Sequence, residues 1–159
     1  MEEKVKTYTL DEAKEKMERF CAYQERCHKE VVQKLRSMRM IPDAIDVIMV
    51  YLIQNNFLSE ERFARSFARG KFHNKKWGRV RITRELKLRG ITHFLIQEAL
   101  EEIEEEYEDV FEELAEKKYD SIKEKNIMKA RKKLADYLLY KGWESHLVYD
   151  KVTELYPFR

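Results

Sequence analysis

The sequence predicts an all-α protein built from three tandem three-helix repeats that form an elongated, curved array. Three observations support this fold class. Only 4 Gly and 2 Pro interrupt the 159 residues, so few tight hairpin turns are available. Charged residues make up 39% of the chain, and Glu, Lys and Arg suit exposed helix surfaces. Apolar positions also recur with a period of about 51 residues, which is typical of a repeat architecture.

Seven sets of positions keep one register when the chain is shifted along itself, allowing one extra residue in the last copy. The sets are Ala13/Ala64/Ala115, Met17/Ala68/Tyr119, Val31/Ile82/Leu134, Leu35/Leu86/Leu138, Met40/Ile91/Trp143, Ile45/Ile96/Val148 and Leu52/Ile103/Leu155. Random helical sequence would not hold a single register through all of them. We therefore expect three repeats, at 8–55, 56–106 and 107–157. Stacked copies share apolar surface and stabilise one another.

Each repeat is expected to contain three helices, whose ends carry recognisable signals. The first copy predicts helices over 10–24, 27–38 and 42–54, with a capping box at Thr9 and Glu12 and with Pro42 in a first turn. The middle copy predicts helices over 60–72, 78–89 and 92–106, capped by Ser59 and Thr92. The last copy predicts helices over 108–123, 127–141 and 144–155.

Glycine marks the end of the second helix in two of the copies. Gly90 and Gly142 occupy the same repeat position, and Arg39 stands there in the first copy. Glycine readily takes the left-handed conformation that ends a helix.

Charge is segregated along the chain, although the formal net charge is only +2. Residues 60–91 hold 11 Lys/Arg against 3 Asp/Glu, whereas residues 98–120 hold 12 Asp/Glu against 2 Lys. A basic block attracts polyanions or acidic protein surfaces. The acidic block keeps apolar residues at helical spacing, such as Ile103, Tyr107 and Phe111, which favours a folded helix over a disordered acidic tail.

Candidate partner-binding residues gather in the middle copy. An arginine stripe lies opposite the apolar face of the first helix, the turn adds further cations, and the second helix directs Arg81, Arg84 and Lys87 away from its buried face. The tryptophan of the turn is interpreted as an anchor on the core, or alternatively as a stacking platform for a base or a contact hot spot. The full set is Arg62, Arg65, Arg69, Lys71, Lys75, Lys76, Trp77, Arg79, Arg81, Arg84 and Lys87.

Motifs for catalysis, metal binding or membrane insertion are absent from the sequence. It has no Gly-rich phosphate loop, GxSxG or HExxH, so we expect no enzyme activity, cofactor or metal. Cys21 and Cys27 form no CxxC pair and are interpreted as ordinary helix cysteines. The N-terminal residues lack a secretory signal, and no apolar run approaches the about 20 residues that span a bilayer. We expect a cytoplasmic protein that is a monomer.

Three segments resemble the central signature of the RecX family of regulatory proteins. They are FLSEERFARSFARGK (57–71), WGRVRITRELKLRGI (77–91) and ITHFLIQEAL (91–100). The matching positions are Glu61, Phe63, Ala64, Arg69, Gly78, Arg81, Ile82, Glu85, Leu86, Arg89, Gly90 and Ile91. One departure is Arg79, where the family's turn usually has proline.

The resemblance implies three tandem three-helix repeats and a non-enzymatic modulator of RecA, the bacterial recombinase that polymerises on single-stranded DNA. Such proteins lie in the groove of the RecA–DNA filament and mostly inhibit its ATPase, strand-exchange and coprotease functions, which affects DNA repair, recombination and the SOS response. Two alternatives stay open. The basic middle repeat could bind single- or double-stranded DNA without RecA, or the array could be a scaffold for an unrelated partner.

Overall fold

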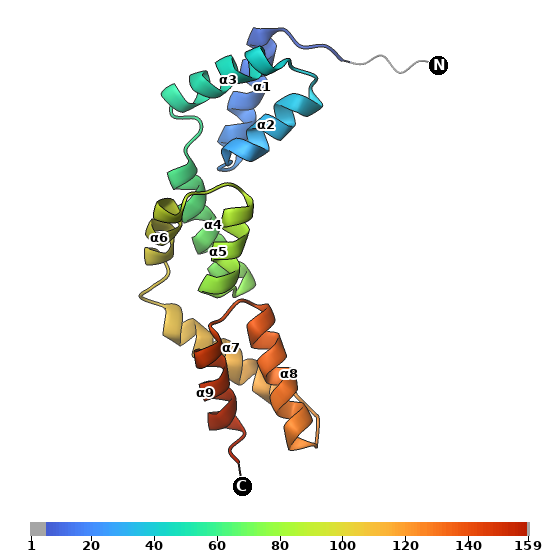
Figure 1. Ribbon diagram of the computed structural model, residues 1–159, viewed down its shortest axis with the longest axis vertical. Coiled ribbons are helices and arrows are strands. Elements are labelled where there is room, and N and C mark those ends of the chain that lie inside the picture. Colours follow the sequence, from blue (N-terminus) through green and yellow to red (C-terminus); the bar gives the residue numbers. More distant parts are fainter. Residues whose placement is uncertain (1–5, 159) are drawn as a thin grey trace, which may run out of the picture.

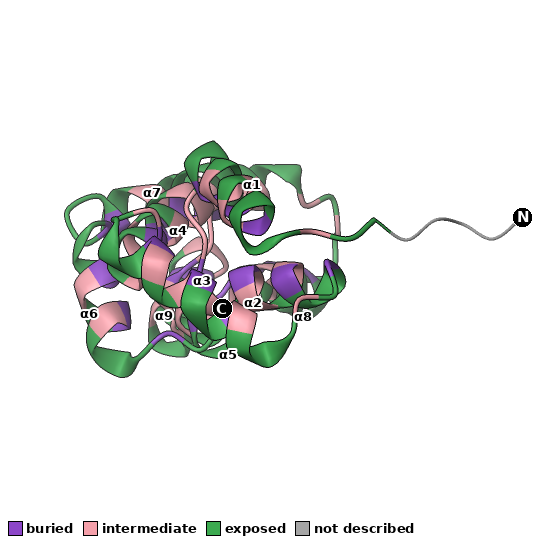
Figure 2. Cartoon of the chain, turned by 90° about the horizontal axis from the view of Figure 1, so that it is seen from above, coloured by how far each residue is buried: buried purple, intermediate pink, exposed green. Residues whose placement is uncertain are grey.

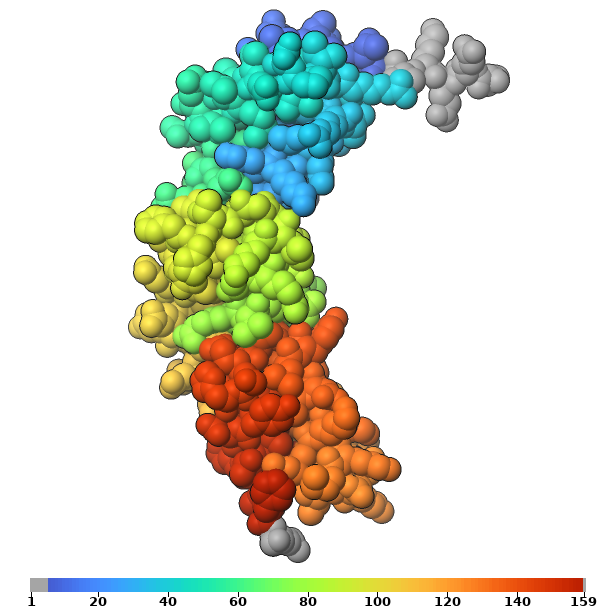
Figure 3. All heavy atoms as spheres, viewed as in Figure 1, coloured from blue at the N-terminus to red at the C-terminus, as the bar shows by residue number. Residues whose placement is uncertain are grey.

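The computed structural model describes residues 6–158, which contain nine α-helices and no β-strand. The helices are α1 (Leu10–Tyr23), α2 (His28–Ser37), α3 (Pro42–Gln54), α4 (Glu60–Lys75), α5 (Arg79–Leu88), α6 (His93–Glu101), α7 (Tyr107–Ser121), α8 (Ile127–Tyr140) and α9 (Ser145–Leu155). They follow one another as three groups of three along an elongated, curved array (Figure 1; Figure 3). The predicted fold class is confirmed, and the repeat boundaries 8–55, 56–106 and 107–157 stay a prediction. None of the described helices combines the length and apolarity needed to cross a membrane.

Two helices differ from the predicted bounds by three residues or more, and the others agree to within two residues at each end. Helix α4 continues three residues beyond its predicted end, to Lys75, so Lys75 lies on the helix and not in the turn. The turn begins at Lys76, which has the left-handed conformation (φ 59°). Helix α6 ends at Glu101, five residues early, and turns of i→i+3 hydrogen bonds lead on to α7. Residues 101–106 are glutamates apart from Ile103. Like charges four residues apart weaken a regular helix, which accounts for the early end.

The predicted helix ends are largely confirmed. The Thr9 hydroxyl accepts from the Glu12 N–H at 3.1 Å, and the Glu12 carboxylate accepts from the Thr9 N–H at 3.1 Å, which completes the capping box. Ser59 caps α4, but Thr92 makes no side-chain cap hydrogen bond to α6. Gly90, Gly142 and Arg39 all have positive φ, at 77°, 96° and 61°. The equivalent positions therefore end the second helix of each repeat in the same left-handed conformation.

The apolar sets that define the repeat form the interior. All of their members are buried except Met40, Tyr119 and Leu155, which are half-buried. Figure 2 shows buried residues on the helix faces that turn toward one another, with exposed residues on the outer faces. Repeat 1 has its own core, whereas repeats 2 and 3 share a second, continuous core that also takes in Cys27. The array therefore has one internal division, between repeat 1 and the fused repeats 2 and 3.

Repeats 2 and 3 are joined where the end of α8 meets the start of α5. The Gly78 N–H donates to the Lys141 carbonyl and the Val80 N–H donates to the Gly142 carbonyl, each at 2.9 Å. The carbonyls that α8 leaves unpaired therefore bind N–H groups that α5 leaves unpaired. A Cβ added at Gly142 would lie 2.2 Å from the Cβ of Arg81, and one at Gly78 would lie 2.5 Å from the Gly142 carbonyl oxygen. This close approach explains why both positions are glycine.

Trp143 seals this junction from the repeat 3 side. The indole is 1% exposed, and its Nε1–H donates to the Lys76 carbonyl at 3.1 Å. Its ring packs on Tyr107 and Phe111, with centroid distances of 4.7 and 5.1 Å. A large aromatic side chain with a satisfied polar atom stabilises an interface strongly, so this residue holds α5 and the turn before it in place.

Candidate functional site

The eleven candidate residues lie in several environments, and the first is the arginine stripe on α4. Arg62 pairs with Glu25 of repeat 1 at 3.0 Å. Arg65 and Arg69 both pair with Glu102, each at 3.4 Å. The stripe therefore connects α4 to repeat 1 and to the end of α6, and its charge is largely compensated within the protein. These ion pairs are partly exposed, so each contributes little to stability.

The second environment is the turn around Trp77. The indole is half-buried against the shared core and meets Phe67 edge-on at a centroid distance of 6.2 Å. The Arg81 guanidinium lies 4.1 Å from the Trp77 ring centroid and 4.7 Å from that of Tyr140, and the Lys71 ammonium lies 5.1 Å from the indole. Arg81 is half-buried, contrary to the expectation that it projects away from the core. These contacts favour the anchor interpretation of Trp77.

Arg79, which departs from the family pattern, also belongs to this turn. Its backbone N–H donates to the Tyr107 hydroxyl at 2.9 Å, a bond that proline could not make. Its guanidinium lies 3.7 Å from the Tyr107 ring centroid and pairs with Glu144 at 2.9 Å. Burial raises the pKa of Tyr107, and its hydrogen bond to Glu144 raises that pKa further, although the Arg79 N–H opposes the shift. Tyr107 thus stays neutral and continues to donate to Glu144.

The third environment is the outward face of α5. Arg84 and Lys87 are exposed there, and neither forms an ion pair with any residue in the described range 6–158. Val80 and Leu88 lie on the same face and are 49% and 61% exposed. With Thr83 they line a shallow depression of about 630 Å³ that Arg79 and Glu144 border. We call Val80, Thr83, Arg84, Lys87 and Leu88 the α5 face.

Sequence reasoning missed Val80 and Leu88 as site residues. Their spacing in the sequence could have revealed them. Val80 and Leu88 each lie four residues from Arg84, so all three share one face of the helix. Protein interfaces combine an apolar centre with a charged rim. A surface that has both cations and exposed aliphatic side chains is therefore better suited to binding a protein than a surface with charges alone.

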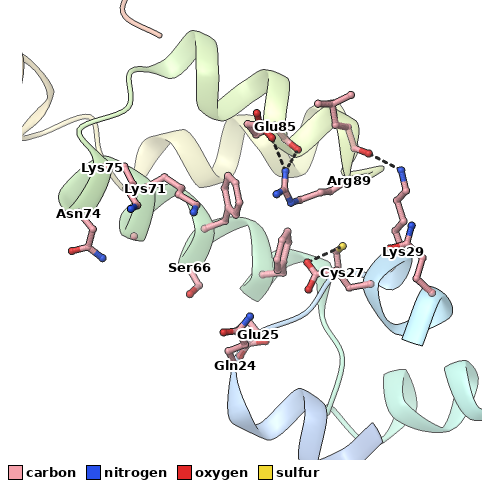
Figure 4. Close-up of a pocket in the computed structure, with 16 residues that line it drawn as sticks. Gln24, Glu25, Cys27, Lys29, Ser66, Lys71, Asn74, Lys75, Glu85 and Arg89 are labelled. Carbon is pink, nitrogen blue, oxygen red and sulfur yellow. Dashed lines mark hydrogen bonds and ion pairs between the residues drawn. The ribbon is translucent and has the colours of Figure 1, made fainter. Parts of the chain in front are cut away.

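Lys71 and Lys75 border a groove between repeats 1 and 2. The groove has a volume of about 710 Å³ and is formed by α2, α4, α5 and the loop before α2 (Figure 4). Inside it, Arg89 pairs with Glu85 at 2.9 Å, and Lys29 donates to a carbonyl oxygen of α5 at 3.1 Å. Much of its charge is compensated, so the α5 face is the stronger candidate for partner contact.

A second basic surface lies in repeat 3 and was also missed. Residues 117–141 hold nine Lys/Arg against three Asp/Glu, but this segment overlaps the end of the acidic block 98–120, so it was not recognised as basic from the sequence. Lys123, Lys125 and Lys129 are exposed on α8 and the loop before it. Figure 1 shows α2, α5 and α8 following one another along the same side of the array.

The described residues offer no sign of a metal or redox site. Residues 6–158 contain no group of three His, Cys, Asp or Glu side chains that could hold a metal ion. Cys21 and Cys27 are free and buried. Cys21 lies on α1, whereas Cys27 is the residue before α2 and not a helix cysteine as expected. Burial raises the pKa of Cys27 to about 11, so its thiol stays protonated at neutral pH.

These observations define a helical-repeat protein whose middle repeat exposes cations beside aliphatic side chains. Family models for the second and third three-helix domains of RecX match residues 59–100 and 104–152. The chain therefore belongs to the RecX family of regulatory proteins.

Individual relatives agree with this assignment. A regulatory protein RecX from Lactobacillus gasseri is 36% identical over 87 residues, which cover 55% of this chain and 32% of that protein. One from Serratia proteamaculans is 32% identical over 102 residues, covering 64% of this chain and 60% of that protein. The chain thus matches less than two thirds of either relative's length. The crystal structure of RecX from Lactobacillus salivarius shares the fold, with a TM-score of 0.77, 24% identity and coverage of 92% of this chain and 96% of that one.

Proposed function

We propose that this protein binds the filament that RecA forms on single-stranded DNA and restrains the ATPase, strand-exchange and coprotease activities of RecA. The role is regulatory and does not involve catalysis. Membership of the RecX family supports this function. The observation that carries it is the α5 face, where Arg84 and Lys87 are exposed and uncompensated beside Val80 and Leu88.

The overall shape is consistent with this partner. A filament presents a long helical groove, and the elongated array of nine described helices offers a long contact surface with the α5 face near its middle (Figure 1). We infer that acidic side chains of RecA meet Arg84 and Lys87, because opposite charges on the two surfaces guide association and set the register.

The wild-type protein should inhibit the single-stranded-DNA-dependent ATPase of RecA from the same species at substoichiometric amounts, since one molecule along a groove restrains several subunits. ATP hydrolysis is measured at fixed RecA and DNA while the regulator is titrated. A folded preparation, verified by its helical circular dichroism, that neither binds the filament nor changes hydrolysis would exclude this function.

Direct binding of nucleic acid is a second candidate, favoured by the exposed cations of α5 (Arg84 and Lys87) and of α8 and the loop before it (Lys123, Lys125 and Lys129). Contacts between Lys or Arg and phosphates release counterions, so such binding weakens steeply as salt rises. Titration of labelled DNA without RecA at several salt concentrations separates the two candidates, because a filament-specific regulator depends on RecA at every salt concentration.

A further inference from the structure

Helix α3 exposes an aliphatic stripe at the far end of the array from repeat 3. Val47, Val50 and Ile53 are 49%, 51% and 42% exposed, and they follow one another at three-residue spacing. The stripe borders a hollow of about 450 Å³, which Asp46, Val47, Val50, Tyr51 and Gln54 line. It lies on repeat 1, which has a separate core, and is distinct from the α5 face.

The repeat itself provides an internal comparison for this stripe. The positions equivalent to Val47 and Val50 are Glu98 and Glu101 in α6, and Asp150 and Thr153 in α9. The same outward face is therefore charged or polar in the other two repeats. The fold does not need aliphatic side chains there, so their presence in repeat 1 requires another explanation. An apolar stripe that is rimmed by polar residues and specific to one repeat is a candidate contact site.

Charge around the stripe indicates what could cover it. The chain has no Lys or Arg between Arg39 and Arg62, and Asp43 and Asp46 are exposed on α3 beside the aliphatic residues. From α1, Lys14 lies 4.8 Å from the Tyr51 ring centroid and Glu18 accepts from the Tyr51 hydroxyl at 2.5 Å. The α3 side of the patch is therefore acidic and lacks any cation of its own.

The size of the patch limits which kind of partner could cover it. The exposed parts of a few aliphatic side chains amount to a few hundred Å². A stable protein–protein interface buries about 1,600 Å² in total, so this stripe alone is too small to hold two copies of the chain together. It is large enough to seat one helix by its apolar face.

We infer that α3 is a docking site for an amphipathic helix of a partner protein, with an aliphatic stripe that packs on Val47, Val50 and Ile53 and flanking Lys or Arg side chains that meet Asp43 and Asp46. This site is separate from the α5 face, so its success or failure does not depend on the function proposed above.

The test uses the full chain and two synthetic helical peptides that share one leucine stripe, flanked by lysines in one and by glutamates in the other. The lysine peptide should bind at least about tenfold more tightly than the glutamate peptide, which corresponds to about 1.4 kcal/mol. The V47E/V50E variant should lose this binding by a similar factor. The V47E/V50E variant places glutamate where α6 has glutamate at the equivalent positions, so the helix should tolerate it. The V47S/V50S variant removes the aliphatic stripe without adding charge.

Several outcomes would overturn the inference. These are equal binding of the two peptides, and unchanged binding by both folded variants. A wild-type dimer in sedimentation that V47E/V50E converts to monomer would show that a second copy covers the stripe. Binding to phosphatidylcholine vesicles that the variants abolish would show a lipid surface instead. Inhibition of RecA by V47E/V50E is measured in parallel, so that loss of the peptide site is distinguished from loss of the α5 face.

Discussion

Replacing Gly142 by alanine should lower the free energy of unfolding by about 2–5 kcal/mol, because two penalties add at this position. Gly142 has a φ of 96°, and a left-handed conformation costs a residue with a Cβ about 1–2 kcal/mol. The new Cβ would also lie 2.2 Å from the Arg81 Cβ and 2.6 Å from the Arg81 backbone N. Relief requires α5 and the turn after α8 to separate, and such overpacking costs about 1–3 kcal/mol.

Urea unfolding followed by circular dichroism measures this change, and the chain offers two matched controls. Gly90→Ala carries the conformational penalty alone, since Gly90 has a φ of 77° and open space around the added Cβ. It should cost about 1–2 kcal/mol. Gly78→Ala carries the steric penalty alone, because its φ is −84° and its Cβ would meet the Gly142 carbonyl. Equal losses for G142A and G90A would contradict the close packing of repeat 3 on α5.

The R84E/K87E double variant should need at least about tenfold more protein for half-inhibition of the RecA ATPase, since each reversal replaces an attraction across the interface by repulsion. Both side chains are exposed and form no ion pair within residues 6–158, so their reversal should leave the helical signal and the unfolding midpoint nearly unchanged. The measurement is a titration of the variant against RecA on single-stranded DNA at constant salt.

The R19E/K117E variant makes the same change in net charge on α1 and α7, where both residues are exposed. It controls for the general effect of charge on a polyanionic filament and should retain near-wild-type inhibition. If both double variants lose inhibition equally, net charge and not the α5 face determines the interaction. Reversal of Arg65 would be a poorer test, because it would also break that residue's ion pair with Glu102.

The three-repeat fold was predictable because core positions recur along the sequence. Ile82 and Leu86 are fully buried, as their repeat positions indicated, and Gly90 and Gly142 end their helices as expected. Local signals such as the capping box at Thr9 act within one helical turn and are visible in sequence. The early end of α6 was not predicted, because apolar spacing continues through Ile103 and Tyr107 although the backbone leaves the helix.

The candidate site was harder to predict, because charge compensation depends on contacts between distant segments. Arg65 and Arg69 looked like free cations until α6 packed beside α4 and brought Glu102 to them. Arg81 lies on a polar position of α5, yet Tyr140 of the next repeat helps to cover it. In the sequence, Arg84 and Lys87 look the same as these arginines, because all of them are cations of the basic middle repeat. Only the packing of the repeats shows that Arg84 and Lys87 stay exposed without an ion pair among the described residues.

The most direct measurement compares the affinity of the protein for a labelled single-stranded DNA carrying a RecA filament with its affinity for the same DNA alone, at equal ionic strength. We predict that the filament binds at least about tenfold more tightly, and that R84E/K87E removes most of this difference. Equal affinity for filament and bare DNA, unchanged in that variant, would contradict a regulator that recognises RecA through the α5 face.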